Sequence, residues 1–213
     1  MSLARRIKNQ LRFLGHWRTP VLTRAGSESP SCPEHVAGEE PEPEASPRLP
    51  RPREILTRYE MEQAKKQAVV EYPNECCGVV LISVAKPKRR ILLPCRNVQN
   101  LLHATDPRTH RRDARTAFYI DPRDLAKIAI RMERGYEVGT IYHSHVETGA
   151  NFSGTDKAQA LVDGSPAYPE AFYVVMSVRR HQVRDIQAYA WDSKQRDFLC
   201  VTPHKTIGEE PRR

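Results

Sequence analysis

The stretch from Asp121 to His145 most constrains the fold, because a helix with both ends marked is followed at once by an apolar strand. Asp121 is a favoured N-cap residue, Pro122 suits the first helical position, and Gly135 is a typical helix terminator. Apolar side chains recur between them at helical spacing. The segment EVGTIYHSH then has the composition of a buried strand. A chain that joins helices to buried strands in this way is predicted to form an α/β domain.

The same patterns extend over most of the chain and set the fold class. Helices are predicted at residues 57–71, 121–135 and 153–165. Strands are predicted at residues 76–85, 89–98, 116–121, 137–145, 171–178 and 185–192, with a further short strand at 198–202. The polar, proline-containing segment 99–116 is predicted to be a loop. Together these elements predict a single α/β domain with a mixed, mostly antiparallel sheet flanked by helices.

The N-terminal quarter of the chain differs in composition from the rest. Residues 1–27 contain six Lys or Arg and no acidic residue, and residues 28–53 are rich in Pro, Glu and Ser. Such segments bury too little apolar surface to offset the entropy of ordering. We therefore predict a disordered extension at 1–53, basic at first and then Pro/Glu-rich, a folded domain at 54–204 and a short tail at 205–213.

The charge distribution and the cysteine content indicate which binding partners and which cellular compartment to expect. The net charge of +8 is divided between the extension (+3), the folded part (+4) and the tail (+1). A nucleic-acid-binding domain would concentrate basic and aromatic residues on one face, so nucleic acid is a disfavoured partner. No apolar run is long enough to cross a bilayer. The five cysteines form no CxxC pair, which predicts a reducing, cytoplasmic setting without a cysteine-based zinc site.

Two histidines close the apolar strand. His143 and His145 are two residues apart, so on a strand both imidazoles point to one face. A zinc ion used in hydrolysis needs three protein ligands and an open position, and Asp156 could supply the third ligand. Ser153 and Asp156 also fit a capping box at a helix start, which explains both residues without a metal. A cap and a metal-binding role are compatible, because a helix start holds both side chains rigidly.

Hydrolysis also requires a base, and one carboxylate stands directly before a buried strand. Glu75 in YPNECCGVVLI could take a proton from the attacking water. The alternative is an exposed acid at the strand entry. Cys76 and Cys77 follow it, and we interpret them as small buried residues and not as nucleophiles, because no companion base is evident.

Five residues together form a pattern that resembles the JAMM motif of the MPN/JAB-domain metallopeptidases. They are Glu75, the pair His143 and His145, then Ser153 after seven residues and Asp156 after two more. The segments RNV, TAFYIDPRDL and FYVVMSV…IQAYAW also resemble the compact prokaryotic branch, over about residues 55–200. One departure is Val146, where many relatives have proline. It bears on the shape of the following loop, VETGANF, and on substrate fit.

The resemblance implies a function and a role for each motif residue. His143, His145 and Asp156 would bind Zn²⁺, with water in the fourth position. Glu75 would act as general base, and Ser153 would hydrogen-bond the oxyanion. The expected activity is that of a zinc metalloprotease, a hydrolase similar to JAMM-type deubiquitinating isopeptidases. The expected substrate is the C-terminal glycine region of a ubiquitin-like or sulfur-carrier protein.

Three alternatives remain open at this point. The first is a zinc amidohydrolase or peptidase acting on a small peptide or amide, because the metal site does not encode the substrate. The second is a non-catalytic MPN scaffold, although no motif residue is lost here. The third is nucleic-acid binding through the basic N-terminal arm, which predicts a steep salt dependence of affinity. The motif implies no particular oligomeric state.

Overall fold

The structure is a computed structural model that describes residues 55–201. The predicted extension at 1–53 and the predicted tail at 205–213 lie outside the described residues. The folded part contains one large sheet, a small two-stranded sheet and four helices.

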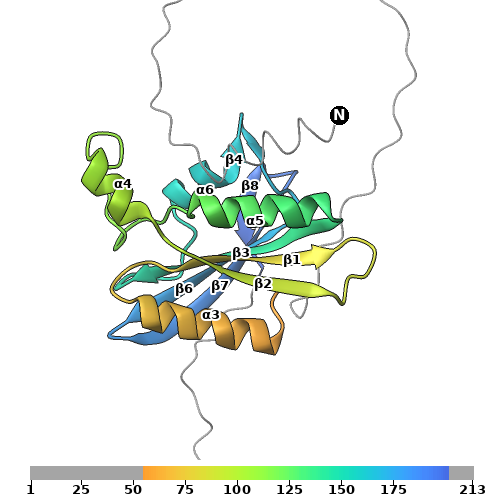
Figure 1. The fold of residues 1–213 in the computed structure, drawn as a ribbon, viewed down its shortest axis with the longest axis horizontal. Coiled ribbons are helices and arrows are strands. Elements are labelled where there is room, and N and C mark those ends of the chain that lie inside the picture. Colours follow the sequence, from red (N-terminus) through yellow and green to blue (C-terminus); the bar gives the residue numbers. More distant parts are fainter. Residues whose placement is uncertain (1–54, 202–213) are drawn as a thin grey trace, which may run out of the picture.

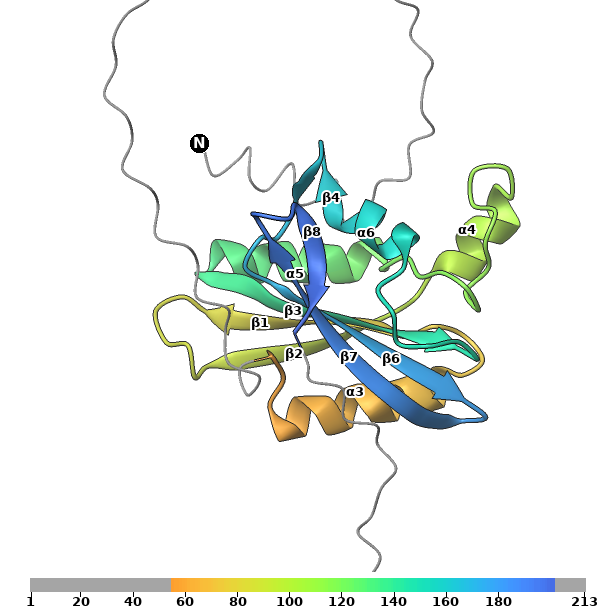
Figure 2. The same ribbon diagram turned by 180° about the vertical axis from the view of Figure 1, so that it is seen from behind.

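Six strands form the large sheet in the order β2-β1-β3-β6-β7-β8 (Figures 1 and 2). They are β1 (Cys77–Ser83), β2 (Arg90–Cys95), β3 (Tyr136–Val146), β6 (Phe172–Arg179), β7 (Gln182–Asp192) and β8 (Asp197–Cys200). β3 and β6 run parallel, and the other neighbouring strands run antiparallel. The predicted mixed, mostly antiparallel sheet is therefore confirmed.

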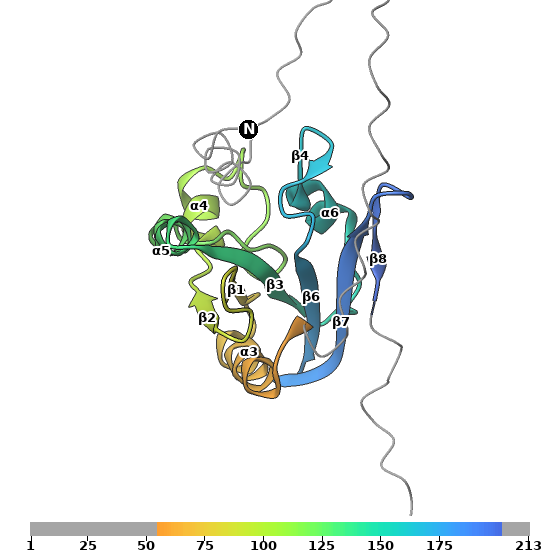
Figure 3. The same cartoon turned by 90° about the vertical axis from the view of Figure 1, so that its right-hand side faces the viewer.

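Helices cover both faces of this sheet. α3 (Arg58–Glu71) packs on one face and α5 (Pro122–Glu133) on the other (Figure 3). Because successive strand residues point to opposite faces, the core divides into two clusters. Val79 belongs to the cluster beneath α5, and Val80 belongs to the cluster beneath α3. None of the helices within residues 55–201 is both long and apolar enough to cross a membrane.

The ends of α5 and α3 follow from local sequence. The Asp121 side chain caps α5 by accepting a backbone N–H bond from the first turn, and Pro122 takes the first helical position. Gly135 follows the helix with a φ of 82°, a left-handed conformation that glycine adopts without strain. Thr57 and Glu60 form a capping box at the start of α3. The predicted boundaries of both helices are confirmed to within a residue or two.

The predicted loop at 99–116 is wrong over its first part, which forms the helix α4 (Gln99–Thr105). The residue that α4 buries is polar: the Gln99 side chain is 1% exposed and donates a hydrogen bond to the Arg112 carbonyl at 2.6 Å. A helix held by a buried amide instead of an apolar stripe has no hydrophobic periodicity to detect.

The predicted strand at 116–121 is also wrong. Only Ile120 forms a bridge, with Asn97 just beyond β2. The Asn97 side-chain oxygen accepts the Tyr119 N–H at 3.0 Å. A side chain therefore takes the place of a backbone acceptor, and the strand ladder does not continue.

The second half of the predicted helix at 153–165 is wrong as well. The segment instead forms α6 (Gly154–Ala160), β4 (Leu161–Val162) and β5 (Ser165–Pro166). Asp163 and Gly164 connect the two short strands with positive φ angles of 52° and 76°. An Asp-Gly pair in this conformation is a favoured two-residue hairpin turn, and this turn explains why the chain leaves the helix.

Candidate metal centre and active site

The histidine pair lies near the end of β3, a central strand bonded to β1 on one side and to β6 on the other. His143 is 2% exposed and His145 is 8% exposed. Their Nε2 atoms are 3.2 Å apart. The predicted orientation of both imidazoles toward one point is therefore present, and pairing on both edges fixes the backbone that carries them.

The start of α6 brings Ser153 and Asp156 to the same place. Ser153 Oγ accepts the Asp156 N–H at 3.2 Å, and Asp156 Oδ2 accepts the Ser153 N–H at 2.7 Å. The capping box is thus confirmed. The same carboxylate faces the histidines, with Oδ1 3.4 Å from His143 Nε2 and Oδ2 3.3 Å from His145 Nε2. One short helix start therefore serves both as a cap and as a platform for Asp156.

The three side chains have the arrangement of a metal site. One ligand atom from each of His143, His145 and Asp156 lies within 4.8 Å of the others. His145 Nδ1 is 3.0 Å from the Gly149 carbonyl oxygen. Because a carbonyl only accepts, Nδ1 carries a hydrogen, so Nε2 faces the site and offers a lone pair whenever the ring is neutral. Two nitrogens and one carboxylate form a donor set that suits catalytic zinc and also Fe(II).

Aromatic rings restrain the more buried imidazole. The Phe118 ring stacks on His143 with a centroid distance of 4.8 Å and an interplanar angle of 29°. The Phe152 ring lies 6.4 Å from His143 and packs in turn on Tyr173 and Phe198. A ring held between packed neighbours keeps its orientation, so the ligand geometry is organised by the core before any ion binds.

Glu75 is not exposed at the strand entry, so that alternative is wrong. Its side chain is 5% exposed and lines the same cavity as His145 and Asp156. The Glu75 backbone is held by two hydrogen bonds. Its N–H donates to the Ala114 carbonyl at 2.6 Å, and its carbonyl accepts from Asn97 Nδ2 at 2.8 Å. This anchoring sets where the carboxyl group points.

Burial raises the pKa of Glu75 to about 8. His145 opposes this increase, and the negative charge of Asp156 adds to it. Burial alone would also raise the pKa of Asp156, but the attraction of His143 and hydrogen bonds from both histidines hold it well below its usual range. Burial lowers the pKa of His145, but Asp156 and Glu75 outweigh burial and raise it. Within one site, Glu75 therefore binds a proton more strongly than an ordinary carboxyl group does, and Asp156 binds one more weakly.

Ser144 and Asn97, to which no role was assigned from the sequence, hydrogen-bond the backbone around Glu75. Ser144 Oγ accepts the Cys76 N–H at 2.8 Å, and this bond ties β3 to the residue after Glu75. A residue between two inward-facing histidines must point to the other face of the sheet, where a buried hydroxyl needs a partner. The alternation of side-chain directions along β3 could therefore have predicted a structural role for Ser144. Cys76 and Cys77 are fully buried, and burial raises the pKa of Cys76 to about 12, so both are inert thiols as expected.

A cavity of about 320 Å³ opens onto these residues. Its lining includes Glu75, His145, Ser153 and Asp156. The other lining residues come from segment 112–118, from segment 146–151 and from α6.

One wall of this cavity is the segment VETGANF, of which Val146, Thr148 and Asn151 line the space. The wall is anchored at two positions: Ser177 Oγ donates to the Thr148 carbonyl, and Tyr189 OH donates to the Ala150 carbonyl at 3.0 Å. The segment is therefore a fixed surface beside the candidate metal centre.

The sequence matches the family described as "Prokaryotic homologs of the JAB domain" over residues 34–192. The match begins within the segment predicted as an extension and ends at the last residue of β7. It includes all five motif residues.

Individual relatives are more distant. The chain is 35% identical over 92 residues to "Tail tip assembly protein K" of Escherichia phage N15, which is 43% of this chain and 30% of that protein. The chain therefore spans less than a third of that relative's length. A solution structure from Desulfitobacterium hafniense has a TM-score of 0.47 at 20% identity and covers 68% of this chain and 86% of its own. A solution structure from Salinibacter ruber has a TM-score of 0.42 at 22% identity and covers 73% and 94%.

Proposed function

We propose that this chain, which belongs to the family of prokaryotic homologs of the JAB domain, is a zinc-dependent metallopeptidase that hydrolyses an amide bond. The observation that carries the proposal is a cluster of three ligand-type side chains at the edge of a cavity that a buried carboxyl group also lines. These side chains are His143, His145 and Asp156, and the carboxyl group is Glu75.

Each residue has a role in the proposed reaction. When bound by the three ligands, Zn²⁺ supplies Lewis acidity, which polarises the scissile carbonyl and lowers the pKa of the attacking water. Glu75 takes the proton from that water and then passes it to the leaving amine. Its raised pKa suits a group that must both accept and donate a proton, and a nearby cation would bring this pKa down toward neutrality.

Ser153 supplies a hydrogen bond to the developing oxyanion. Its Oγ already accepts the Asp156 N–H, so the hydroxyl hydrogen remains available to donate. Ser153 lines the cavity together with His145 and Asp156. A donor fixed by a helix cap needs little reorganisation during the reaction, which is the condition under which such a bond is most effective.

The proposed substrate is the C-terminal glycine region of a ubiquitin-like or sulfur-carrier protein. A cavity of about 320 Å³ with a fixed wall at residues 146–151 accommodates an extended segment of small residues. This substrate class rests on the family resemblance and on the size of the cavity.

The test uses Glu75→Gln, which keeps the size of the side chain and removes the base. Metal content is measured by elemental analysis, and cleavage of carrier proteins with C-terminal extensions is followed by mass spectrometry. We expect full zinc loading with lost turnover. Glu71→Gln is the matched control, because Glu71 is a partly buried carboxylate on α3 that does not line the cavity. Undiminished turnover in Glu75→Gln would refute the assigned base.

A second candidate is a scaffold role, and one observation favours it: the phage N15 relative is named for tail tip assembly. A scaffold needs the fold but not the base. On that account Glu75→Gln would leave complex formation and biological function intact, and no amide substrate would be turned over. Cleavage of short peptides but of no carrier protein would instead identify a small-peptide amidase.

A further inference from the structure

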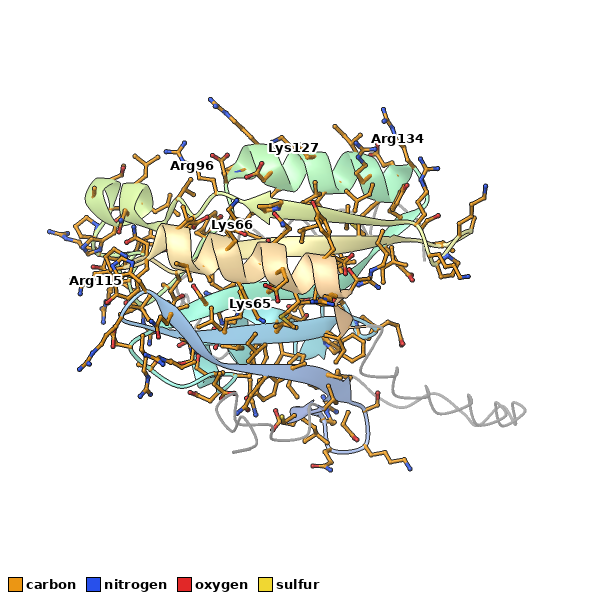
Figure 4. All side chains as sticks on the ribbon, turned by 90° about the horizontal axis from the view of Figure 1, so that it is seen from below. Lys65, Lys66, Arg96, Arg115, Lys127 and Arg134 are labelled. Atoms are coloured by element: carbon orange, nitrogen blue, oxygen red, sulfur yellow. The ribbon has the colours of Figure 1, made fainter. Side chains whose placement is uncertain are left out.

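Two arginines share the cavity with the proposed active site. Arg112 and Arg115 come from the segment between α4 and α5, and both line the space that Glu75 and Ser153 line. In Figure 4, Arg115 lies at the same end of the molecule as α4, away from Arg134 at the far end of α5. Both side chains are exposed, as is that of their neighbour Arg111.

The backbone that carries these arginines is firmly held. The Gln99 side chain donates to the Arg112 carbonyl at 2.6 Å, and the Asn100 side chain accepts the Ala114 N–H at 2.7 Å. The helix α4 thus holds the segment through two polar side chains, of which Gln99 is buried. Asn97 Nδ2 adds a bond to the carbonyl of residue 117 at 3.1 Å. A fixed backbone limits the positions that the guanidinium groups can reach.

The guanidinium groups act on their surroundings through charge alone, Arg112 on Glu75 and Arg115 on Tyr72. Within residues 55–201, neither Arg112 nor Arg115 forms an ion pair or a side-chain hydrogen bond. Asp113 lies between them in sequence, but its carboxylate accepts the backbone N–H of Arg115. Two arginines on a held backbone, with free donors beside a cavity, form a surface suited to a carboxylate.

The charges of the site point the same way. A divalent cation bound by the histidine pair and Asp156 would be balanced by Asp156 and the ionised Glu75. Arg112 and Arg115 then leave an excess of positive charge in the cavity lining. Such an excess raises the local concentration of an anionic substrate and orients it.

The position of the arginines indicates which part of the substrate they meet. Ala114 lies between them, and its carbonyl accepts the N–H of Glu75 at 2.6 Å. Glu75 gives its proton to the leaving amine in the proposed reaction, so groups joined to Glu75 adjoin the leaving-group side. In a peptide, the α-carboxylate of a C-terminal residue is separated from its amide nitrogen by a single carbon.

We propose that Arg112 and Arg115 bind the α-carboxylate of the departing residue, so that the protein releases a C-terminal amino acid in preference to a lysine side chain. The proposal deepens the amide hydrolysis proposed above and rests on it. A lysine ε-amine within a folded acceptor has no carboxylate at this distance. The arginine pair therefore discriminates between C-terminal trimming and isopeptide cleavage.

Binding to an inactive protein tests this directly. The full-length, zinc-loaded Glu75→Gln variant is titrated with two labelled peptides that end in Gly-Gly-Ala, one with a free carboxylate and one with a carboxamide. Fluorescence anisotropy gives the Kd of each. We expect the carboxylate peptide to bind about tenfold to a hundredfold more tightly, which is the range for charge-assisted hydrogen bonds. The preference should weaken with added salt because both arginines are exposed.

Variants assign the preference to these side chains. Arg112→Gln and Arg115→Gln, each in the Glu75→Gln background, should reduce the ratio of the two Kd values toward one. Arg111→Gln is the matched control, since Arg111 is exposed in the same segment but does not line the cavity. It should keep the ratio. Zinc content is measured in every variant, so that a misfolded site is recognised separately.

The outcomes separate this proposal from the proposed hydrolysis. Equal Kd values for the two peptides, or no binding of either, would overturn the carboxylate site even if the wild type cleaves both. A retained Kd ratio with no cleavage by the wild type would uphold the arginine site while the hydrolysis fails. A ratio unchanged by both arginine substitutions would also overturn the assignment.

Discussion

Replacing Glu75 with glutamine should change how the stability of the metal-free protein depends on pH. Burial raises the pKa of this carboxyl group to about 8, against an ordinary value of 4.5. Between these two values the folded state holds a proton that the unfolded state releases. Because the folded state binds more protons there, the free energy of unfolding falls as pH rises. Glutamine cannot ionise, so the variant should lack this loss.

The magnitude follows from the two pKa values. At about 1.4 kcal/mol per pH unit, the gap corresponds to about 5 kcal/mol in total. About 3.5 kcal/mol of it falls between pH 5 and pH 8. This is large beside the 5–15 kcal/mol that is typical of a whole domain. Glu75 is also one cause of the raised pKa of His145, so the variant should lose less stability through His145 as pH rises, which acts in the same direction.

Urea denaturation of chelator-treated protein measures the effect. The free energy of unfolding is determined for wild type and Glu75→Gln near pH 5 and near pH 8. We expect the free energy of unfolding of the variant, relative to that of the wild type, to be about 3.5 kcal/mol higher near pH 8 than near pH 5. Added zinc should remove the difference, because a nearby cation favours the carboxylate. Parallel pH profiles for the two metal-free proteins would refute the reasoning that Glu75 is held protonated by burial.

Three further predictions concern other parts of the site. Ser153→Ala should lower kcat by about a hundredfold to a thousandfold through loss of an oxyanion donor, while loss of the cap costs only about 1 kcal/mol; an unchanged kcat in a folded, zinc-loaded variant would contradict the assigned role. Ser144→Ala should lower the free energy of unfolding by about 1–3 kcal/mol, because it leaves a buried backbone N–H without its acceptor; urea denaturation checks this, and an unchanged midpoint would argue against it. Gly78→Ala should lower the Tm, since a Cβ there would overlap the Tyr142 ring, whereas Gly154→Ala meets no atom within 4 Å and should not; calorimetry that finds equal Tm values would contradict the packing argument.

Local signals in the sequence predicted the strands of the sheet and the helices that pack on it. Asp121, Pro122 and Gly135 marked both ends of α5 because capping chemistry depends on neighbouring residues alone. The strands of the core were found because both faces are covered, which makes them continuous apolar runs. Strand alternation predicted that His143 and His145 share one face, and the resemblance to the JAMM motif joined Glu75, Ser153 and Asp156 to them.

The features that were missed depend on partners far away in the chain. The helix α4 is stabilised by Gln99, whose acceptor is the Arg112 carbonyl, and no apolar pattern marks such a contact. Segment 116–121 has strand composition, but the Asn97 side chain ends its pairing. The end of α6 is different, because the Asp163-Gly164 turn was a readable signal that the helical pattern before it outweighed.

Zinc-dependent cleavage of a carrier protein tests the central claim most directly. The purified chain is stripped with a chelator, reconstituted with one equivalent of zinc, and incubated with ubiquitin-like carrier proteins that bear a residue after their C-terminal glycines; intact-mass spectrometry follows the products. We expect release of that residue by the zinc-loaded protein, no release by the stripped protein, and none by zinc-treated Asp156→Ala. Stoichiometric zinc binding with no cleavage of any carrier, or cleavage that persists after chelation, would contradict this expectation.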